Sequence, residues 1–520
     1  MNRPALISDL IAATASDRVI TDPAELFVYE SDGFTIAHAR PAAVVFVTST
    51  EEIQKVILIL IKHDAQIVPR GTGTGLAGGC VAFDNGVIVS TVKLNKILTI
   101  DLENRVAHVQ AGVRNTALSD AAAQIPLEVE ASLSAQDPPA LTSPSFDPVD
   151  SMAGQALATP KKSTPIANPY HFAPDPSSQR ASSIGGNAST NAGGIHTLKD
   201  FVTSNHILGL EMVLASGEII QVGGHNGAYQ GGPFDLPGLI CGHEGTFGII
   251  TSLWVRLVPK ATSFRTIIAF YSTTADACNT VSDIIAAGHL PAAMEMMDGS
   301  MIQIVEDAFH FGFSRAAQAM VLIELDGIES LLDAQTKEVC AICDSHSPIS
   351  GQTSSDPARR AALWKARKSA FGAIGRVSHS YCTQDACVPR SKLAEVLQRI
   401  DEIGKEHGLA ITNVFHAGDG NVHPIFMYDD RDQEQVQNTL AAAEKVLKYC
   451  IDIGGTVTGE HGVGVEKIHI MPYQFDEPTM NQFQAVKHSF DPDERINAGK
   501  LMPSEKVKIS LLKPGRHVPQ

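Results

Sequence analysis

A glycine-rich segment at residues 69–79, PRGTGTGLAGG, constrains the fold of this chain more than any other feature. Gly73, Gly75 and Gly78 have the spacing of a dinucleotide-binding fingerprint. In a Rossmann fold, however, that loop must open a helix whose N-terminus holds the pyrophosphate, whereas the following residues, CVAFDNGVIVS, predict a turn and a strand. The Rossmann interpretation therefore fails. Five glycines in nine residues still exceed what a plain turn needs, and their N–H groups can surround a pyrophosphate without a helix.

The residues around this loop predict a βαβ unit followed by a run of strands. Residues 41–50 predict an apolar strand that ends at Thr48–Thr50, where a side chain can cap a helix starting at Glu51. That helix leads into a second strand at 65–70. Beyond the loop, three short strands separated by Asn and Gly are predicted at residues 86–92, 96–104 and 105–113.

The length and charge of the chain limit what it can be. A chain of 520 residues exceeds what one hydrophobic core usually supports, so we expect two or three domains. Its 44% hydrophobic and 19% charged residues are typical of a globular enzyme. The formal net charge of -17 argues against a nucleic-acid partner, which needs a basic surface. An anionic substrate would have to meet locally placed cations.

No segment of the chain predicts secretion or membrane insertion. The first residues contain no long apolar core, so we expect no secretory signal. The most apolar run, residues 56–61, is too short to span a bilayer and predicts one buried helix. The eight cysteines show no disulfide framework or iron–sulfur spacing, and we interpret Cys340 and Cys343 as ordinary buried thiols on one helical face. We therefore expect a cytoplasmic protein.

Composition changes mark the domain organisation. Residues 126–169 contain eight of the 28 prolines, and we predict a surface insertion there because such a composition cannot build a packed core. A second domain is predicted to start near Ala261, where helix-like and strand-like stretches begin to alternate. Its predicted helices cover residues 275–290, 390–408 and 435–455, and its predicted strands cover 320–327 and 409–418.

Two polar clusters in the second half are candidates for chemistry. His416 and His423 flank a turn-rich AGDGN segment that predicts a β-hairpin. Facing each other across it, their Cβ atoms would lie about 5 Å apart and could share one metal ion. In residues 458–464, glycines bracket Glu460 and His461 and let the backbone approach a ligand closely. A lone histidine is more often a satisfied polar residue, but this combination favours a site.

A third cluster, LWKARK at residues 363–368, is predicted to lie on a helix. From the residues alone, Arg367 is equally compatible with a solvated position and with a binding role. We interpret its neighbour Lys368 as solvated.

Three blocks, in order along the chain, carry a family resemblance. They are residues 69–79, APDPSSQRASSIGGNASTNAGGIHTLK at 173–199 and CGHEGTFGIIT at 241–251. Together they resemble the FAD-binding domain of the vanillyl-alcohol oxidase type. Within that superfamily, the chain is similar to the branch of D-lactate dehydrogenase, D-2-hydroxyglutarate dehydrogenase and the catalytic subunit of glycolate oxidase. The resemblance covers nearly the whole chain except residues 126–169.

The resemblance implies an α+β fold. A two-part FAD-binding domain would occupy residues 1–260, including the insertion at 126–169. An α+β substrate (cap) domain would follow at 261–480, and residues 481–520 would return to the FAD domain.

The resemblance also implies which residues hold FAD. The glycine loop would surround the pyrophosphate, the second block would line the flavin, and the third would close around the adenine end. Asn497 lies where the family usually shows Asn-Pro-Gly-Lys, with Ala498 in place of the proline. The glycine loop has no histidine for covalent attachment, so we expect non-covalent FAD. The implied cofactor-binding residues are Pro69, Arg70, Gly71, Thr72, Gly73, Thr74, Gly75, Gly78, Gly79, Pro174, Asp175, Ser178, Ser182, Gly185, Gly186, Asn187, Asn191, Gly193, Gly194, Glu244, Gly245, Gly248, Ile249, Ile250 and Asn497.

For the reaction, the resemblance implies roles for six residues. The metal ligands would be His416, His423 and Glu460, and the catalytic residues would be His461 as base, Arg367 as carboxylate anchor and Asn421. The ion would be divalent, such as zinc or manganese. These residue types suit oxidation of a 2-hydroxy acid: a histidine accepts the hydroxyl proton, a metal lowers the hydroxyl pKa, and a guanidinium pairs with the carboxylate.

The choice of substrate rests on weaker features. The D-2-hydroxyglutarate enzymes carry a lysine shortly before an aspartate, whereas this chain has Thr383 and Gln384 before Asp385. We therefore expect a monocarboxylate such as glycolate or D-lactate, with hydride passing to flavin N5. Electrons would leave to a quinone or to partner flavin and iron–sulfur subunits of a glycolate oxidase-type complex, which could hold the protein at the inner face of the membrane.

Other interpretations remain open. A D-lactate dehydrogenase acting alone or a D-2-hydroxyglutarate enzyme would share the fold, the cofactor and the site. From a different class, a metal-dependent hydrolase could use His416, His423 and Glu460, although it leaves the glycine blocks unexplained. A non-catalytic flavin-carrying subunit would have no need of these histidines.

Overall fold

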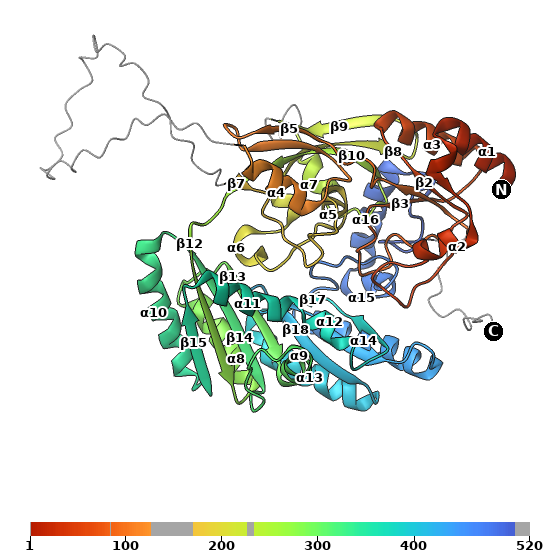
Figure 1. Cartoon of the computed structure of the whole chain (residues 1–520). Coiled ribbons are helices and arrows are strands. Elements are labelled where there is room, and N and C mark those ends of the chain that lie inside the picture. Colours follow the sequence, from red (N-terminus) through yellow and green to blue (C-terminus); the bar gives the residue numbers. More distant parts are fainter. Residues whose placement is uncertain (1, 84, 126–169, 226–232, 505–520) are drawn as a thin grey trace, which may run out of the picture.

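The computed structural model describes residues 2–83, 85–125, 170–225 and 233–504. These residues form two parts, with the N-terminal half of the chain in the upper part of Figure 1 and the chain from β12 (Ser263–Tyr271) onward in the lower part. The last helix returns to the upper part. The predicted insertion at residues 126–169 lies outside the described residues.

The first sheet contains the predicted βαβ unit. Its strand order is β1-β2-β4-β3, and both β2 and β3 run parallel to β4. Between β2 and β3 lies α3 (Thr50–Lys62), whose first turn is capped by the Ser49 hydroxyl. The strands are β1 (Val19–Ile20), β2 (Ala43–Phe46), β3 (Ile67–Arg70) and β4 (Val87–Ser90).

Helix α3 buries only one of its faces. Val56, Ile57 and Leu60 pack in the core of the first sheet together with residues of α1 (Arg3–Ala13), whereas Leu58 is 49% exposed. The helix predicted at residues 56–61 is therefore present, and it is buried on the side that faces the sheet and open to solvent on the other.

The second sheet is antiparallel, with the order β5-β6-β10-β8-β9. Two of the three strands predicted beyond the glycine loop, β5 and β6, belong to it, and the third is β4 of the first sheet. The glycine loop therefore connects two strands of the first sheet and opens no helix. The strands are β5 (Ile97–Asp101), β6 (Val106–Gln110), β8 (Ile207–Leu214), β9 (Ile219–Gly223) and β10 (Gly248–Arg256).

The lower part is built on a sheet of nine strands. Seven follow the order β15-β12-β14-β13-β18-β19-β17, while β20 pairs with both β18 and β16. The predicted strands at 320–327 and 409–418 correspond to β14 and β18. Besides β12, the strands are β13 (Ala293–Asp298), β14 (Ala319–Gly327), β15 (Ser350–Ser354), β16 (Ser380–Thr383), β17 (Ala386–Cys387), β18 (Ala410–His416), β19 (Asn421–Val422) and β20 (Pro424–Tyr428).

Helices cover both faces of this large sheet. One face packs against α8 (Thr274–Ala286), α10 (Glu329–Ser345), α13 (Leu393–Glu406) and α14 (Gln433–Asp452), three of which were predicted. The other face packs against α9 (Gly299–Phe309), α11 (Pro357–Lys368) and α12 (Ala370–Ile374). The LWKARK cluster lies on α11, as predicted.

The remaining elements are short, apart from α16. In the upper part they are α2 (Pro23–Leu26), α4 (Asn115–Ala123), α5 (Ile184–Thr190), α6 (Thr197–Asp200), α7 (Leu236–Ile240), β7 (Tyr170–His171) and β11 (Val258–Pro259). Near the C-terminus, α15 (Met471–Gln474) precedes α16 (Glu477–Phe490). The 3-10 turns are η1 (Ser16–Arg18), η2 (Phe27–Tyr29), η3 (Thr203–His206), η4 (Arg390–Lys392) and η5 (Ile468–Ile470).

The C-terminal segment packs on the upper part. The Phe490 ring stacks on Phe247 with 4.6 Å between centroids. Ile67 N–H donates to Arg495 O, and Asn497 N–H donates to Ile67 O, so this segment lies beside β3 where the glycine loop begins. On this arrangement we propose the domain division at residues 1–260, 261–480 and 481–520.

Two further sequence interpretations concern helices. Within the described ranges, no helix is both long and apolar enough to cross a membrane. Cys340 and Cys343 lie on α10 as free thiols, with Cys343 buried in the core of the lower part and Cys340 half-buried against it.

Candidate functional site

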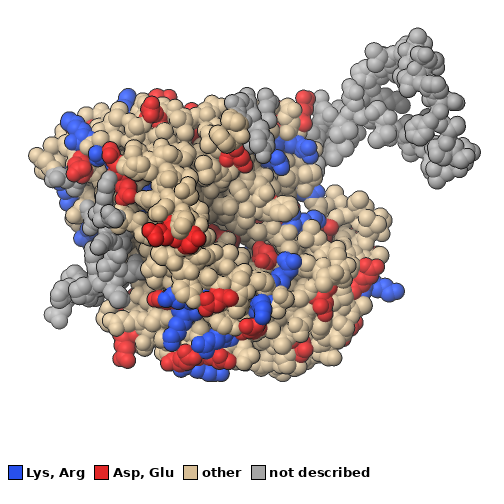
Figure 2. Space-filling view, turned by 180° about the vertical axis from the view of Figure 1, so that it is seen from behind, with Lys and Arg blue, Asp and Glu red and all other residues tan. Residues whose placement is uncertain are grey.

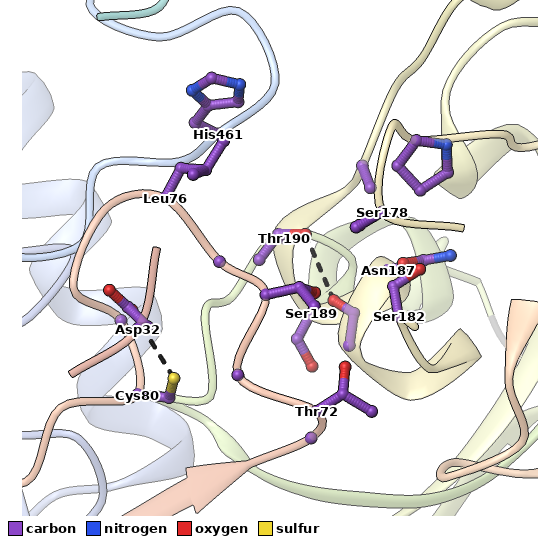
Figure 3. A pocket seen from close by; sticks show the side chains of 18 of the residues that line it. Asp32, Thr72, Leu76, Cys80, Ser178, Ser182, Asn187, Ser189, Thr190 and His461 are labelled. Carbon is purple, nitrogen blue, oxygen red and sulfur yellow. Dashed lines mark hydrogen bonds between the residues drawn. The ribbon is translucent and has the colours of Figure 1, made fainter. Parts of the chain in front are cut away.

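The glycine loop and the histidine cluster line one cavity. It measures about 460 Å³, within the range of small-molecule sites, and residues of both parts of the molecule surround it. Figure 3 shows the glycine loop between the two sides, with Thr72 facing the helix that carries Asn187 and with Leu76 near His461. The structure therefore joins the two regions of the sequence that were singled out separately.

Most of the residues predicted to hold a cofactor line this cavity. From the glycine loop they are Pro69, Arg70, Gly71, Thr72, Gly73, Thr74, Gly75 and Gly79. From the second block they are Ser178, Ser182, Gly185, Gly186 and Asn187, and from the third block Glu244, Gly245, Gly248, Ile249 and Ile250.

Seven residues of the same prediction do not line the cavity, and they contact residues that lie behind or beside its lining. Gly78 packs against Phe34 and Val465. The Asn497 amide donates to Gly79 O and Glu244 O and so ties the first block to the third. The seven residues are Gly78, Pro174, Asp175, Asn191, Gly193, Gly194 and Asn497.

The other contacts of these residues involve the second block. The Pro174 carbonyl accepts a hydrogen bond from Asn115, and Asp175 pairs with His196. Gly194 approaches Asp175 closely, and Asn191, in the left-handed region, accepts from the Ser204 N–H. A Cβ at Gly193 would lie 2.8 Å from Glu460 Oε2, so the bare backbone here makes room for that carboxylate.

Backbone geometry explains why the loop needs glycine. Gly73 has φ +75°, which L side chains rarely adopt, and a Cβ there would lie 2.3 Å from the Arg70 guanidinium. Arg70 is buried beneath the loop and donates to Ser31 O. The charge of Arg70 therefore stands directly behind the loop, where it can face a pyrophosphate.

The second block leaves polar atoms unsatisfied toward the cavity. Ser182 Oγ and Asn187 Nδ2 are buried and have no hydrogen-bond partner within the described part of the chain, and both residues line the cavity. Such atoms cost free energy unless a ligand completes them. A polar, planar cofactor bound along the glycine loop would satisfy them, so these residues fit FAD.

His416, His423 and Glu460 converge at one point. Glu460 Oε1 lies 3.1 Å from His416 Nε2 and 3.2 Å from His423 Nε2. In a tetrahedral zinc site with bonds of about 2.1 Å, ligand atoms lie about 3.4 Å apart. The three atoms therefore fit a single divalent ion.

The hairpin that carries the two histidines differs from the prediction in register. His416 pairs with Asn421 across the turn, and His423 follows β19, outside the strand pairing. The two rings nevertheless lie 5.2 Å apart between centroids. The irregular backbone between β19 and β20, rather than direct cross-strand pairing, turns His423 toward His416.

His461 adjoins this cluster. Its ring stacks on His423 with centroids 4.8 Å apart, and its Nε2 lies 4.0 Å from Glu460 Oε1. Burial lowers the pKa of His461 to about 4, so the imidazole is neutral at pH 7. A neutral imidazole lining a cavity can accept a proton from a ligand.

Two buried carboxylates hold the loop that carries Glu460 and His461. Asp385 accepts hydrogen bonds from the backbone N–H groups of residues 459–461 and from the Thr458 hydroxyl. Glu244 accepts from the N–H groups of Val463 and Gly464. Because Glu244 belongs to the upper part and Asp385 to the lower part, the loop is fastened from both sides.

Charges around His416 favour a cation at this point. Burial opposes a charged imidazole, yet Glu295 and Glu460 on either side hold the pKa of His416 well above its ordinary value. The two carboxylates thus need a positive charge between them. A divalent ion would supply it while leaving the imidazole neutral, which is the form that binds metal.

Arg367 lies beside the same cluster. The residue is 2% exposed, lines the cavity, and its Nε donates to Glu295 Oε2 at 2.6 Å. Its position is therefore not that of a solvated helix residue. Lys368, interpreted above as solvated, is exposed but also lines the cavity.

Cations near the cavity matter because the protein as a whole carries a formal net charge of -17. On the face seen in Figure 2, acidic and basic residues are interspersed over both parts. Of the basic residues in the described structure, Arg70, Arg367 and Lys368 line the cavity. An acidic ligand would meet its cations there.

Asn421 does not line the cavity. It is buried behind residues 458–464, where a Cβ at Gly459 would lie 2.2 Å from its Oδ1. Asn421 therefore packs against Gly459 of this loop, and its predicted catalytic role stays a prediction.

Several residues of the site were not assigned to it from the sequence, although Thr383 and Asp385 had been used to choose between substrates. Asp32, Cys80, Phe371, Tyr381 and Thr383 line the cavity, and Asp385 and Glu295 support it. A signal existed for the last two, because each is a carboxylate next to or inside an apolar strand (AAMEMMD and CTQDAC). For the others, nothing in the local sequence points to a shared cavity.

Comparison with known proteins identifies the family. The profile described as "FAD linked oxidases, C-terminal domain" matches residues 260–501, and the profile "FAD binding domain" matches 41–138 and 166–223. Glycolate oxidase subunit GlcD of Escherichia coli is 35% identical over 92% of this chain and 87% of its own length. The chain belongs to the FAD-linked oxidases.

Other members of this family agree with the branch expected from the sequence. GlcD of Bacillus subtilis is 33% identical over 96% of this chain and 97% of its own length. A D-lactate dehydrogenase of Anaerostipes hadrus is 28% identical over 89% of this chain and 90% of its own length. This FAD-linked oxidase therefore lies in the branch of D-lactate dehydrogenase and the GlcD protein of glycolate oxidase, as predicted.

Solved structures support the fold. A p-cresol methylhydroxylase with substrate bound superimposes with a TM-score of 0.73 at 15% identity, covering 97% of this chain and 98% of that one. The predicted fold class, a vanillyl-alcohol oxidase type FAD-binding domain followed by an α+β domain, is confirmed.

Proposed function

We propose that this FAD-linked oxidase is a dehydrogenase that oxidises a small 2-hydroxy acid, such as glycolate or D-lactate, to the 2-oxo acid. One observation carries the proposal: a single cavity is lined by the glycine loop, by Arg367 and by the cluster of His416, His423, Glu460 and His461. A cofactor cradle, a carboxylate-binding cation and a proton acceptor are the three parts that this reaction needs.

The cofactor residues support non-covalent FAD. The glycine loop contains no histidine, and the nearest thiol, Cys80, is half-buried and donates a hydrogen bond to Asp32. Burial raises the pKa of the Cys80 thiol to about 12, so the thiolate needed for attachment is scarce at neutral pH. We expect acid or heat precipitation to release the flavin, whereas yellow colour in the precipitate would contradict this.

The residues around the substrate have separate tasks. When bound, FAD would accept the hydride at N5, and a divalent ion held by His416, His423 and Glu460 would lower the hydroxyl pKa. Arg367 would pair with the carboxylate and thereby orient the carbon that is oxidised. His461 would take the hydroxyl proton on a ring nitrogen, and Phe371 and Tyr381 would keep water from the reacting carbon.

The pattern near Asp385 favours a monocarboxylate. Thr383 lines the cavity, and the Gln384 amide is engaged by Glu466 at 2.6 Å. No lysine therefore stands at the position from which the D-2-hydroxyglutarate enzymes are expected to bind a second carboxylate. Lys368 also lines the cavity, so D-2-hydroxyglutarate belongs in the test as a competing substrate.

The decisive experiment is anaerobic reduction of the bound flavin. Glycolate, D-lactate and D-2-hydroxyglutarate would be mixed with the purified protein in parallel, and bleaching of the flavin absorbance would be followed. We expect rapid bleaching with glycolate or D-lactate. A protein that contains no flavin but hydrolyses esters or amides with added zinc would instead support the hydrolase alternative.

We also propose that electrons leave through partner flavin and iron–sulfur subunits. The relatives at 35% and 33% identity are named as subunits of glycolate oxidase, which supports an assembly. In that assembly the protein would be cytoplasmic, and its partners could hold it at the inner face of the membrane. Purification of the complex from its native cell would test this.

A further inference from the structure

Glu295 joins the two groups that are proposed to handle substrate. This side chain on β13 is fully buried. Its Oε2 accepts a hydrogen bond from Arg367 Nε at 2.6 Å, and its Oε1 accepts from His416 Nδ1 at 2.6 Å. The other ring nitrogen of His416, Nε2, lies 3.1 Å from Glu460 Oε1. One carboxylate thus contacts both the guanidinium and a proposed metal ligand.

The fold explains this contact through strand register. β13 and β18 are antiparallel, and Glu295 lies directly opposite His416. Their side chains point to the same face of the sheet, because residues paired in antiparallel strands share a face. Helix α11 packs on that face and brings Arg367 to the carboxylate. Three separate elements therefore meet at one buried acid.

A second carboxylate on the same face provides a natural comparison. Glu324 on β14 is fully buried and accepts hydrogen bonds from Arg360 and Trp364, which lie earlier on α11. Glu295 and Glu324 therefore both attach α11 to the sheet. Glu295 alone of the two contacts His416.

The hydrogen bond to Glu295 decides which nitrogen of His416 is available. An ionised carboxylate accepts only, so Nδ1 must carry its proton there. With Nδ1 protonated, the neutral imidazole presents its lone pair at Nε2, the atom that points to Glu460 and His423. Carboxylates that hold metal-binding histidines in this way typically improve metal affinity 10–100-fold.

We propose that Glu295 is a positioning residue that keeps His416 in the metal-binding tautomer and, through the same carboxylate, aims the guanidinium of Arg367 at the substrate. The inference rests on the proposed function, since Glu295 would position residues of the metal site and the carboxylate site named there. Because Nε of Arg367 is occupied by Glu295, its Nη groups remain for the substrate carboxylate. The metal and the carboxylate anchor are thereby held at a common, fixed spacing.

The test compares Glu295→Gln with wild type. The amide is nearly isosteric, but its NH2 group cannot accept a hydrogen bond, so the N–H donors of His416 and Arg367 can no longer both be satisfied. Metal-stripped protein that retains FAD would be titrated calorimetrically with Zn²⁺ and, in a separate sample, with Mn²⁺. We expect the Kd of the preferred ion to rise 10–100-fold, with FAD content unchanged and with a higher KM for the 2-hydroxy acid.

Two further variants separate positioning from general stability. Glu324→Gln also removes a buried carboxylate under α11, and we expect it to bind the ion with the wild-type Kd. Glu295→Asp retains the charge on a shorter side chain, and it replaces Glu295→Gln in the test if that variant does not fold. We expect Glu295→Asp to raise the Kd of the ion as well.

Specific outcomes would overturn the inference. It is wrong if Glu295→Gln or Glu295→Asp folds and binds the ion with a Kd within threefold of the wild-type Kd. It is also wrong if Glu324→Gln raises the Kd of the ion as much as Glu295→Gln does. It is also wrong if wild type binds neither Zn²⁺ nor Mn²⁺. The proposed oxidation fails separately, when the FAD-loaded wild type is not reduced by any of the three hydroxy acids.

Discussion

The three histidines of the cavity differ in what surrounds them, and this separates their tasks. His416 lies between two carboxylates, His423 contacts Glu460, and His461 makes no ion pair shorter than 4.0 Å with the described residues. A histidine held by carboxylates suits an ion, whereas a neutral histidine whose ring is not hydrogen-bonded to a carboxylate suits proton transfer. The surroundings of these three residues therefore favour His461 as the base.

Replacing His461 by alanine tests this assignment. The variant should bind FAD normally, because His461 lies outside the glycine loop, but flavin reduction should slow by about 10²–10⁴-fold, or roughly 3–5 kcal/mol of barrier. Stopped-flow reduction by glycolate measures the step. His469→Ala, an exposed histidine eight residues later, is the control and should behave as wild type. A loss of only a few-fold in His461→Ala would assign the proton to another group.

Arg367→Lys tests the carboxylate anchor. Lysine retains the charge but cannot offer two parallel N–H groups, so about 1.5–3 kcal/mol of binding should be lost. This corresponds to a KM higher by roughly 10–100-fold, with a smaller change in kcat. Steady-state kinetics with glycolate measure it, and Arg359→Lys on the exposed side of α11 is the control. An unchanged KM would mean that another cation holds the acid.

At the scale of elements, the loop of residues 458–464 is the least regular part of the site and the most strongly held. It has no helix or strand of its own, yet Asp385 and Glu244 satisfy its N–H groups. Burial alone would raise the pKa of Asp385, but Lys467 and the nearby histidines hold it well below the usual range. Buried charges thus replace secondary structure in fixing Glu460 and His461.

Asp385→Asn should loosen this loop and remove the nearest carboxylate of Lys467, which leaves Glu466 at 3.9 Å as its remaining partner. Breaking one partner of a buried pair typically costs about 3–5 kcal/mol, so the free energy of unfolding should fall by that order. Denaturant unfolding and turnover would be measured together. The double variant Asp385→Asn with Lys467→Met should regain much of the stability, since the lysine that lost its nearest carboxylate is also removed, but not the turnover. Full recovery of turnover would show that the loop does not depend on Asp385.

At the scale of the whole molecule, an ion-pair network joins the two parts. His196 Nδ1 lies 2.8 Å from Asp175 in the upper part, and its Nε2 lies 3.5 Å from Glu324 in the lower part. Beside it, Lys199 pairs with Asp326. Burial opposes the charge on His196, but the two carboxylates raise its pKa to about 10. A charged histidine therefore links the two parts of the molecule.

The link should weaken in alkali. Because the folded-state pKa of His196 lies above its ordinary value near 6.5, its contribution to stability is complete below about pH 6.5 and declines as pH rises toward about 10. Thermal unfolding of wild type and His196→Gln from pH 6 to 10 should show a difference in Tm that shrinks with pH. His488→Gln, at an exposed site, should differ from wild type by a small and constant amount. A Tm difference between wild type and His196→Gln that stays constant with pH would exclude a stabilising role for the charge on His196.

Local patterns determined much of this protein. The spacing of apolar residues located α3, α8, α13 and α14, and the absence of a helix after the glycine loop ruled out a Rossmann fold. These features depend on neighbours within a few residues, which is the range over which periodicity and capping act. The order of the three motif blocks was sufficient to place the chain in its family.

Only the tertiary structure decided how the site is assembled. That Glu295 faces His416, that Asp385 holds the N–H groups of a loop about 75 residues later, and that Glu244 reaches across from the other part are all contacts between distant segments. Strand register and domain packing set such contacts, and neither leaves a local trace in the sequence. Residue types therefore indicated the chemistry, and apolar strand patterns gave a signal for Glu295 and Asp385, whereas only the tertiary structure showed which groups these two acids contact.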